Sequence, residues 1–218
     1  MKQAVIFDVD GVLVDSYQAH FHSWRQMLAE LGAEFTDQQF RATFGRTSRE
    51  IIAELYDGQL TEEKNRELDD VKEANYREII RHDFPAIDGA IELIDTLTKA
   101  EFSLAVGSSG PPANVELTLQ CLGRADRFAA VVTGGDVSRG KPDPQVFLLA
   151  ADRLGVPPAQ CAVVEDAIAG VEAANRAGMT SIGLTGTANR EQLAHAKLVV
   201  DSLRELDAAK IGNLITKQ

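Results

Sequence analysis

Short apolar runs alternate with segments of helical periodicity from Pro85 to the end of the chain. Apolar runs bounded by Gly, Asp or Pro predict buried strands, whereas apolar residues at three- and four-residue spacing predict helices. The expected strands are 102–106, 128–132, 162–164, 181–184 and 198–200, and the expected helices are 90–99, 113–122, 144–154, 167–177 and 190–194. This alternation predicts a parallel sheet covered by helices on both faces.

One more strand is expected near the start of the chain, at the run Ala4-Val5-Ile6-Phe7, which is as apolar as a central strand. The block that follows it, residues 17–83, shows only helical periodicity and charge. We therefore predict an α/β core with a Rossmann-like, doubly wound parallel sheet, formed by residues 1–16 and 84–218. Residues 17–83 are expected to be inserted into this core as a small α-helical cap.

Four helices are expected in the inserted block. Apolar residues recur at helical spacing from His20 to Leu31, and Gly32 ends that helix. A second helix is expected after Thr36, which has Gln39 three residues later in a capping-box arrangement. The third covers 48–56. The fourth, 62–81, is highly charged and is expected to be solvated, with an apolar side formed by Leu68, Val71, Tyr76, Ile79 and Ile80.

Composition limits the possible partners. The net charge of −11 argues against nucleic-acid binding, because no basic patch is available to displace counterions from phosphates. Cys121 and Cys161 follow no metal-ligand spacing and are expected to be buried, reduced thiols. Asp8 and Asp10 interrupt the first apolar run, so a signal peptide is not expected, and no run is long enough to span a membrane. A soluble, cytoplasmic protein is the expectation.

Polar residues follow four of the predicted strands. Asp8 and Asp10 follow the first strand, and Gly107-Ser108-Ser109 follow the strand at 102–106. Lys141 lies in the loop after the strand at 128–132, and Glu165-Asp166 follow the strand at 162–164. Each group could equally be an ordinary turn residue, a helix cap or a solvated lysine. Taken together, they predict a ligand site at the carboxyl edge of the sheet, where open α/β sheets bind ligands.

These residue types suit phosphoryl transfer. A carboxylate that attacks a phosphate monoester meets like-charge repulsion, so a lysine and a divalent cation have to neutralise the site. Oxygen ligands from Asp8, Asp166 and a backbone carbonyl suit Mg²⁺, which we expect as the cofactor. Asp10 can protonate the leaving oxygen and later deprotonate the attacking water. Backbone N–H groups and the Ser108 hydroxyl near a helix N-terminus can hold the phosphate.

The sequence resembles the haloacid dehalogenase superfamily. The segment 7–16, Phe-Asp-Val-Asp-Gly-Val-Leu-Val-Asp-Ser, is similar to the first of its four motifs. Ser108, Lys141-Pro142 and Glu165-Asp166 follow in the order of the other three. The resemblance implies that Asp8 forms an aspartyl-phosphate and that Asp10 is the general acid/base. It implies that Ser108 and Lys141 complete the catalytic set. It also implies that Mg²⁺ is held by Asp8, the Asp10 carbonyl and Asp166, with Glu165 direct or through water.

Within this family the chain resembles the β-phosphoglucomutase-like branch, which has a helical cap after the first motif. That resemblance implies that cap residues orient the acid/base and bind the part of the substrate remote from the reacting phosphate. The expected substrate-binding residues are Gly11, His20, Trp24, Arg49, Lys72 and Ser109. Alternatively, His20 and Trp24 pack in the core of the cap, and Lys72 is solvated.

One segment departs from the mutase pattern. The mutases carry a Lys-Asn pair shortly after the second-motif serine, whereas this chain has Ser109-Gly110-Pro111-Pro112. We therefore predict a Mg²⁺-dependent phosphatase of small phosphorylated metabolites, with sugar phosphates as the expected class. The alternatives are a β-phosphoglucomutase and a catalytically silent phospho-ligand-binding protein.

Overall fold

The computed structural model describes residues 2–43 and 47–216. The chain forms two compact units. One comprises Met1–Asp15 and Pro85–Gln218, and the other comprises Ser16–Phe84. Among the described residues, no helix combines the length and the apolar character that a membrane span requires.

The first unit contains a six-stranded sheet whose paired strands are all parallel. Its spatial order is β3-β2-β1-β4-β5-β6, the order of a doubly wound Rossmann-like sheet, so the predicted fold class is confirmed. The strands are β1 (Ala4–Phe7), β2 (Ser103–Gly107), β3 (Phe128–Val132), β4 (Cys161–Glu165), β5 (Thr180–Leu184) and β6 (Leu198–Val200). The N-terminal strand β1 lies in the middle, between β2 and β4, which explains why every one of its residues is buried.

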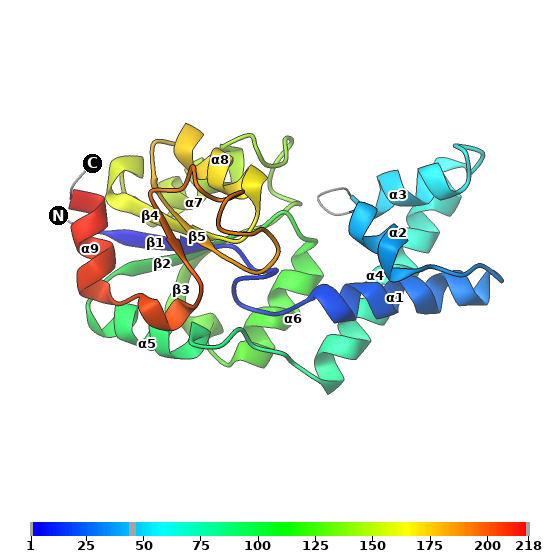
Figure 1. Cartoon of the computed structure of the whole chain (residues 1–218), viewed down its shortest axis with the longest axis horizontal. Helices are drawn as coiled ribbons and strands as arrows, with labels where there is room; N and C mark the ends of the chain where they lie inside the picture. The colour runs from blue at the N-terminus through cyan, green and yellow to red at the C-terminus, as the bar shows by residue number, and fades with distance from the viewer. Residues whose placement is uncertain (1, 44–46, 217–218) are drawn as a thin grey trace. The chain divides into compact units, whose positions relative to one another are not determined.

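Helices cover both faces of this sheet, with α7 and α8 on one face and α5 on the other (Figure 1). Connections between parallel strands are right-handed, so the direction of a connection along the sheet decides which face its helix covers. The first connections lead from β1 toward β3 and the later ones lead toward β5, so their helices lie on opposite faces. The α-helices of this unit are α5 (Ala90–Lys99), α6 (Pro112–Leu122), α7 (Gln145–Leu154), α8 (Ile168–Arg176) and α9 (Ala208–Thr216). Three short 3₁₀ helices, η1 (Ala125–Arg127), η2 (Pro158–Gln160) and η3 (Leu203–Glu205), complete it.

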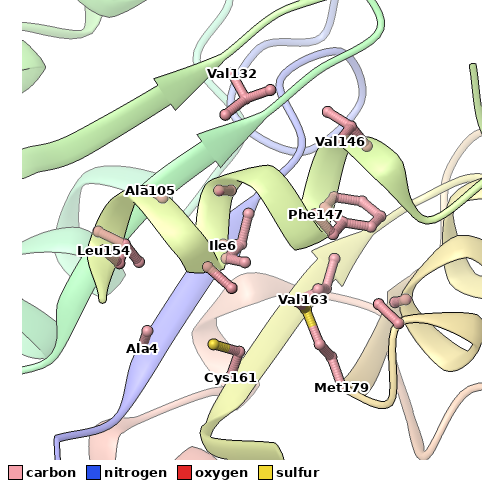
Figure 2. Packing of buried hydrophobic residues seen from close by; sticks show 14 of the residues in the cluster. Ala4, Ile6, Ala105, Val132, Val146, Phe147, Leu154, Cys161, Val163 and Met179 are labelled. Atoms are coloured by element: carbon pink, nitrogen blue, oxygen red, sulfur yellow. The ribbon is translucent and has the colours of Figure 1, made fainter. Parts of the chain in front are cut away.

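The main core lies between the sheet and α7 (Figure 2). Ile6 of β1, Val163 of β4 and Phe147 of α7 are all fully buried there. Because strand side chains alternate between faces, Ala4 and Ile6 lie on the α7 side, and Val5 and Phe7 belong to the opposite face. Both faces are apolar, as expected for a strand covered by helices on each side.

Two differences from the predicted elements concern the C-terminal third. Residues 190–194, expected to be helical, form turns. The Leu193 N–H donates to the Asn189 carbonyl, four residues back, whereas the Ala194 N–H donates to the Glu191 carbonyl, three residues back. With these mixed spacings no regular helical series of hydrogen bonds develops. A segment of this length has too few hydrogen bonds to offset the cost of helix nucleation. Conversely, α9 was not predicted; its buried side is formed by Ile211 and Ile215.

The second unit consists of helices. They are α1 (Tyr17–Glu30), α2 (Asp37–Ala42), α3 (Ser48–Leu55) and α4 (Glu62–His82). The predicted capping box at Thr36 and Gln39 is present at the start of α2, and Gly32 follows α1 with a φ of +72°. The core of this unit contains Trp24, Leu28, Phe35, Phe40, Ile52 and Leu68.

Candidate active site

The order of the strands brings the two acidic motifs together. β1 and β4 are neighbours, with Phe7 opposite Val164, so Asp8 and Glu165 follow at the same level of the sheet. The Asp8 N–H donates to the Val164 carbonyl at 3.0 Å, which fixes the start of the loop. Connections leave β1 and β4 toward opposite edges of the sheet, and such a switch point is where doubly wound sheets bind ligands.

Lys141 joins the two strand ends. Its ammonium lies 2.8 Å from Asp8 Oδ1 and 2.5 Å from Glu165 Oε1. The side chain is only 9% exposed, and its Nζ atom lies 4.9 Å from the centroid of the Phe147 ring. Lys141 is therefore not the solvated loop lysine that its sequence context also allowed. It is a buried cation fixed between two carboxylates.

Glu165 has both carboxylate oxygens engaged. Oε1 accepts from Lys141, and Oε2 accepts from the backbone N–H groups of Asp166 and Ala167, each at 3.0 Å. The side chain is completely buried. Gly170 in α8 makes room for it, because a Cβ atom at that position would lie 1.9 Å from the Glu165 carboxyl carbon. These contacts fix the Glu165 carboxylate in place, and Glu165 in turn holds the Lys141 ammonium.

Asp166 is enclosed by the loop that follows β1. Gly11 in that loop has a φ of +74°, and a Cβ atom there would lie 1.8 Å from Asp166 Oδ2. Both the backbone conformation and the close approach therefore require glycine. Thr187, in the loop after β5, forms a side-chain hydrogen bond with Asp166 that opposes the rise in the pKa of Asp166 caused by burial. Gly11, expected to contact substrate, is placed by the structure against Asp166.

Burial dominates the electrostatics of this cluster. It raises the pKa of Asp8 to about 7, although the neighbouring Lys141 ammonium opposes the shift. Burial and the charges of Glu165 and Asp8 raise the pKa of Asp166 well above its ordinary value. Burial lowers the pKa of Lys141, but the Asp8 and Glu165 carboxylates outweigh it, so the pKa is raised overall. One ammonium group thus faces three buried carboxyl groups.

The cluster fits a divalent metal ion. Asp8, Glu165 and Asp166 each offer a carboxylate oxygen, and these atoms lie within 4.8 Å of one another. Carboxylate oxygens are the ligands that hard cations such as Mg²⁺ prefer. Ionising all three groups leaves negative charge that the single Lys141 cannot balance, and a divalent cation would supply the balance. A buried acidic cluster with these donors therefore fits the predicted metal site.

The second-motif loop lies beside Asp10. Ser108 is 1% exposed, and its hydroxyl oxygen accepts from the Gly110 N–H at 2.9 Å. Ser108 is not the N-cap of the next helix, because α6 begins after Pro111. A Cβ atom on Gly110 would lie 3.7 Å from Asp10 Oδ2, which locates the Asp10 carboxylate next to this loop. Ser109 is exposed.

The loop after β3 supports the Ser108 loop. The Gly134 N–H donates to the Gly110 carbonyl at 3.0 Å. A Cβ atom at Gly134 would lie 2.4 Å from the Ser109 carbonyl oxygen, so the two loops pack in direct contact. Asp136 holds the supporting loop by accepting from Thr133 N–H at 2.8 Å.

The remaining predicted site residues lie in the helical unit. Trp24 is 2% exposed and belongs to that unit's core, the packing role considered as an alternative. His20 Nδ1 lies 2.9 Å from Lys72 Nζ, and the His20 ring stacks on Tyr76. Lys72 is 2% exposed, so the alternative of a solvated lysine is wrong. Arg49 is exposed and pairs with Asp69.

Three supporting residues were not identified from the sequence: Gly134, Gly170 and Thr187. A glycine inside a helical pattern, as at Gly170, indicates close packing against something, and this signal was available. The partner of Gly170 could not be read from the sequence, because it depends on how α8 packs against the end of β4. In the sequence, Thr187 looks like an ordinary loop residue.

Comparisons with known proteins support the resemblance to the haloacid dehalogenase superfamily. The family model of the haloacid dehalogenase-like hydrolases matches residues 2–178. Validoxylamine A 7'-phosphate phosphatase from Streptomyces hygroscopicus subsp. limoneus is 35% identical, over 97% of this chain and 99% of the relative. β-Phosphoglucomutase from Bacillus subtilis (strain 168) is 33% identical, over 84% of this chain and 83% of the relative.

A solved structure agrees over nearly the full length. The crystal structure of CbbY from Rhodobacter sphaeroides in complex with xylulose-(1,5)bisphosphate has a TM-score of 0.88 at 26% identity, covering 97% of this chain and 99% of that chain. These similarities agree with the sheet order and with the four strand-end motifs. The prediction of a haloacid dehalogenase-like enzyme is confirmed. The chain belongs to the haloacid dehalogenase-like hydrolases.

Proposed function

We propose that this protein is a Mg²⁺-dependent phosphatase of small phosphorylated metabolites that acts through an aspartyl-phosphate on Asp8. The observation that carries the proposal is the Asp8–Lys141–Glu165 arrangement beside Asp166, in which a buried carboxylate has a fixed cation 2.8 Å away. A carboxylate in this setting is oriented for attack, and its charge is partly neutralised before a phosphate arrives.

The proposed reaction has two steps. The Asp8 carboxylate attacks phosphorus, and the alkoxide leaves with a proton from Asp10. Asp10 then takes a proton from water, which attacks the phosphorus and releases phosphate and free Asp8. Ser108 and the backbone of its loop hold the phosphate oxygens, and Lys141 offsets their charge. Mg²⁺, held by Asp8, Asp166 and the Asp10 carbonyl, with Glu165 direct or through water, would reduce the repulsion between carboxylate and phosphate.

Sugar phosphates are the proposed substrate class. The named relatives support it: one is a validoxylamine phosphate phosphatase, one is a phosphoglucomutase, and one was solved with a sugar bisphosphate. We further propose that residues 17–83 act as a cap, in which His20, Arg49 and Lys72 recognise the part of the substrate remote from the reacting phosphate. Ser109 and Gly11 are proposed to contact the phosphate end.

A β-phosphoglucomutase is the second candidate, and the similarity to the Bacillus subtilis enzyme favours it. A mutase has to grip a second phosphate while the aspartyl-phosphate waits for a sugar hydroxyl. The residues after Ser108 argue against this, because Ser109-Gly110-Pro111-Pro112 offer no side-chain cation. Hydrolysis is therefore the function that the site supports better.

The test is phosphate release from an aryl phosphate and from a panel of phosphorylated metabolites, with and without Mg²⁺. The wild-type enzyme should release phosphate only with the metal, and sugar phosphates should be the best substrates. Asp8→Asn should abolish release while keeping the fold, since the amide has nearly the same shape but cannot attack phosphorus. Full activity in excess chelator, or in Asp8→Asn, would overturn the proposal.

A further inference from the structure

A compact turn follows β3, and one carboxylate closes it. Asp136 Oδ2 accepts from the backbone N–H and from the hydroxyl of Thr133, each at 2.8 Å. In return, the Asp136 N–H donates to the Thr133 carbonyl at 3.0 Å. The Thr133 hydroxyl oxygen also accepts from the Gly135 N–H at 3.3 Å. These hydrogen bonds fix the conformation of residues 133–136, which we call the β3 turn.

Arg153 ties the β3 turn to α7. One guanidinium nitrogen of Arg153 donates to Asp136 Oδ1 at 2.7 Å, and the other donates to the Val131 carbonyl at the end of the strand. Asp136 therefore has both carboxylate oxygens engaged, one by its own turn and one by the helix. The hydrogen bonds from Arg153 and Thr133 lower the pKa of Asp136 to about 2, so this carboxylate is ionised at any ordinary assay pH. Moving the turn would break a charge-assisted hydrogen bond.

The β3 turn packs directly on the Ser108 loop, residues 108–112. The Gly134 N–H donates to the Gly110 carbonyl at 3.0 Å. A Cβ atom on Gly134 would lie only 2.4 Å from the Ser109 carbonyl oxygen, so the two backbones touch without an intervening side chain. The position of the Ser108 loop therefore depends on the position of the β3 turn.

The conformation of the Ser108 loop sets the direction of its phosphate-binding groups. The Ser108 hydroxyl oxygen accepts from the Gly110 N–H at 2.9 Å, so a displacement of Gly110 would also redirect the hydroxyl. This hydroxyl and the backbone N–H groups of the loop are the groups proposed above to hold the phosphate oxygens. Groups of this kind have to be placed accurately, because a displacement of about 1 Å can cost about 100-fold in rate.

We infer that Asp136 is a positioning residue for phosphate binding: it fixes the β3 turn, and the β3 turn holds the Ser108 loop in the conformation that binds phosphate. This inference rests on the proposed function, in which the Ser108 loop holds the phosphate oxygens. Asp136 acts through the loop and not by contact with phosphate, since its carboxylate would repel an anion and both of its oxygens already accept hydrogen bonds.

The experiment measures the affinity of the full-length protein for inorganic phosphate, by calorimetric titration in excess Mg²⁺, and kcat and KM for an aryl phosphate. Wild type is compared with Asp136→Ala. Asp95→Ala is the matched control, because the Asp95 side chain also accepts from an arginine, Arg124, and is 35% exposed against 29% for Asp136. Asp95 lies on α5, which covers the other face of the sheet from α7 (Figure 1).

Two substitutions at Thr133 test the same turn without removing the carboxylate. Thr133→Val has nearly the same shape but lacks the hydroxyl, so Asp136 loses a donor and the Gly135 N–H loses its acceptor. Thr133→Ser keeps the hydroxyl and should restore the turn. A role in general stability would lower the unfolding midpoint of these variants without changing the phosphate affinity of the folded protein.

We expect Asp136→Ala to weaken phosphate binding and to raise the KM by at least about tenfold, because the phosphate ligands lose their placement. Thr133→Val should weaken phosphate binding by about threefold, as the loss of a neutral hydrogen bond predicts. Thr133→Ser and Asp95→Ala should bind phosphate like wild type.

The inference would be overturned by a phosphate affinity of Asp136→Ala equal to that of Asp95→Ala, by Thr133→Ser binding as weakly as Thr133→Val, or by no phosphate binding to wild type. If Asp136→Ala does not fold, the comparison of the two Thr133 variants decides. Failure of the wild-type enzyme to release phosphate from any ester would overturn the proposed hydrolysis, while the calorimetric comparison would still decide the role of Asp136.

Discussion

Replacing Gly170 by alanine should damage the active site from within a helix. The new Cβ atom would lie 1.9 Å from the Glu165 carboxyl carbon, and an ordinary contact begins at 3.4 Å, so the carboxyl has to move by about 1.5 Å. Such a shift breaks the 2.5 Å contact with Lys141 and the two bonds from the Asp166 and Ala167 N–H groups.

The size of the effect follows from these bonds. The hydrogen bond to the charged Lys141 is worth about 1.5–3 kcal/mol, and the two amide bonds about 1 kcal/mol each. Alanine in place of a helical glycine returns about 1 kcal/mol. We therefore expect Gly170→Ala to lower the free energy of unfolding by about 2.5–4 kcal/mol. We also expect it to lower kcat/KM at least tenfold, because Lys141 loses its anchor.

Urea unfolding followed by circular dichroism measures the stability change, and phosphate release measures activity. Gly212→Ala is the control, since Gly212 is also helical and its new Cβ would meet the end of the flexible Gln3 side chain at 3.2 Å and the Phe102 ring at an ordinary contact distance of 3.6 Å. The control should be unchanged or slightly more stable. A Gly170→Ala protein as stable and as active as the control would refute the reasoning on Glu165.

Three further outcomes are expected. Burial raises the pKa of Asp8 from 3.8 to about 7. Between these two pH values the metal-free folded state therefore binds more protons than the unfolded state. Its free energy of unfolding should fall as pH rises through this window. Protons compete with the metal there, so the increase in Tm caused by Mg²⁺ should be larger at pH 8 than at pH 5; an increase that does not grow with pH would contradict the metal assignment. Gly11→Ala should weaken Mg²⁺ binding at least tenfold in calorimetric titration, because its Cβ displaces Asp166, and wild-type affinity would show that Asp166 is not a ligand. With β-glucose 1-phosphate and a bisphosphate primer present, product analysis should find glucose and phosphate, whereas efficient formation of glucose 6-phosphate would establish the mutase.

The parts of the fold that local patterns determine could be predicted. β1, β3 and β6 begin and end at the predicted residues, because each run of apolar side chains stops at a polar residue, Asp8, Thr133 or Asp201. The four strand-end motifs were identifiable because a parallel sheet gathers the carboxyl ends of its strands at one edge. In the structure, the register between β1 and β4 then brings Asp8 and Glu165 together.

Features that depend on distant contacts could not be predicted. Lys72 lies in a highly charged helix, so its sequence context indicated exposure. It is buried because His20, 52 residues earlier, and the neighbouring Glu73 supply its partners. The turns at 190–194 and the helix α9 show the same limit, since apolar spacing over so few residues does not separate a helix from a series of turns.

The central claim is that phosphate passes through a covalent bond to Asp8. Borohydride reduces an acyl phosphate to an alcohol, so quenching the enzyme during turnover of an aryl phosphate and reducing it would convert a phosphorylated aspartate to homoserine. Peptide mass spectrometry then locates the change. We predict homoserine at position 8, dependent on both substrate and Mg²⁺, and absent from Asp8→Asn. Phosphate release by the wild-type enzyme with Asp8 unmodified, or with the modification at another residue, would contradict the account.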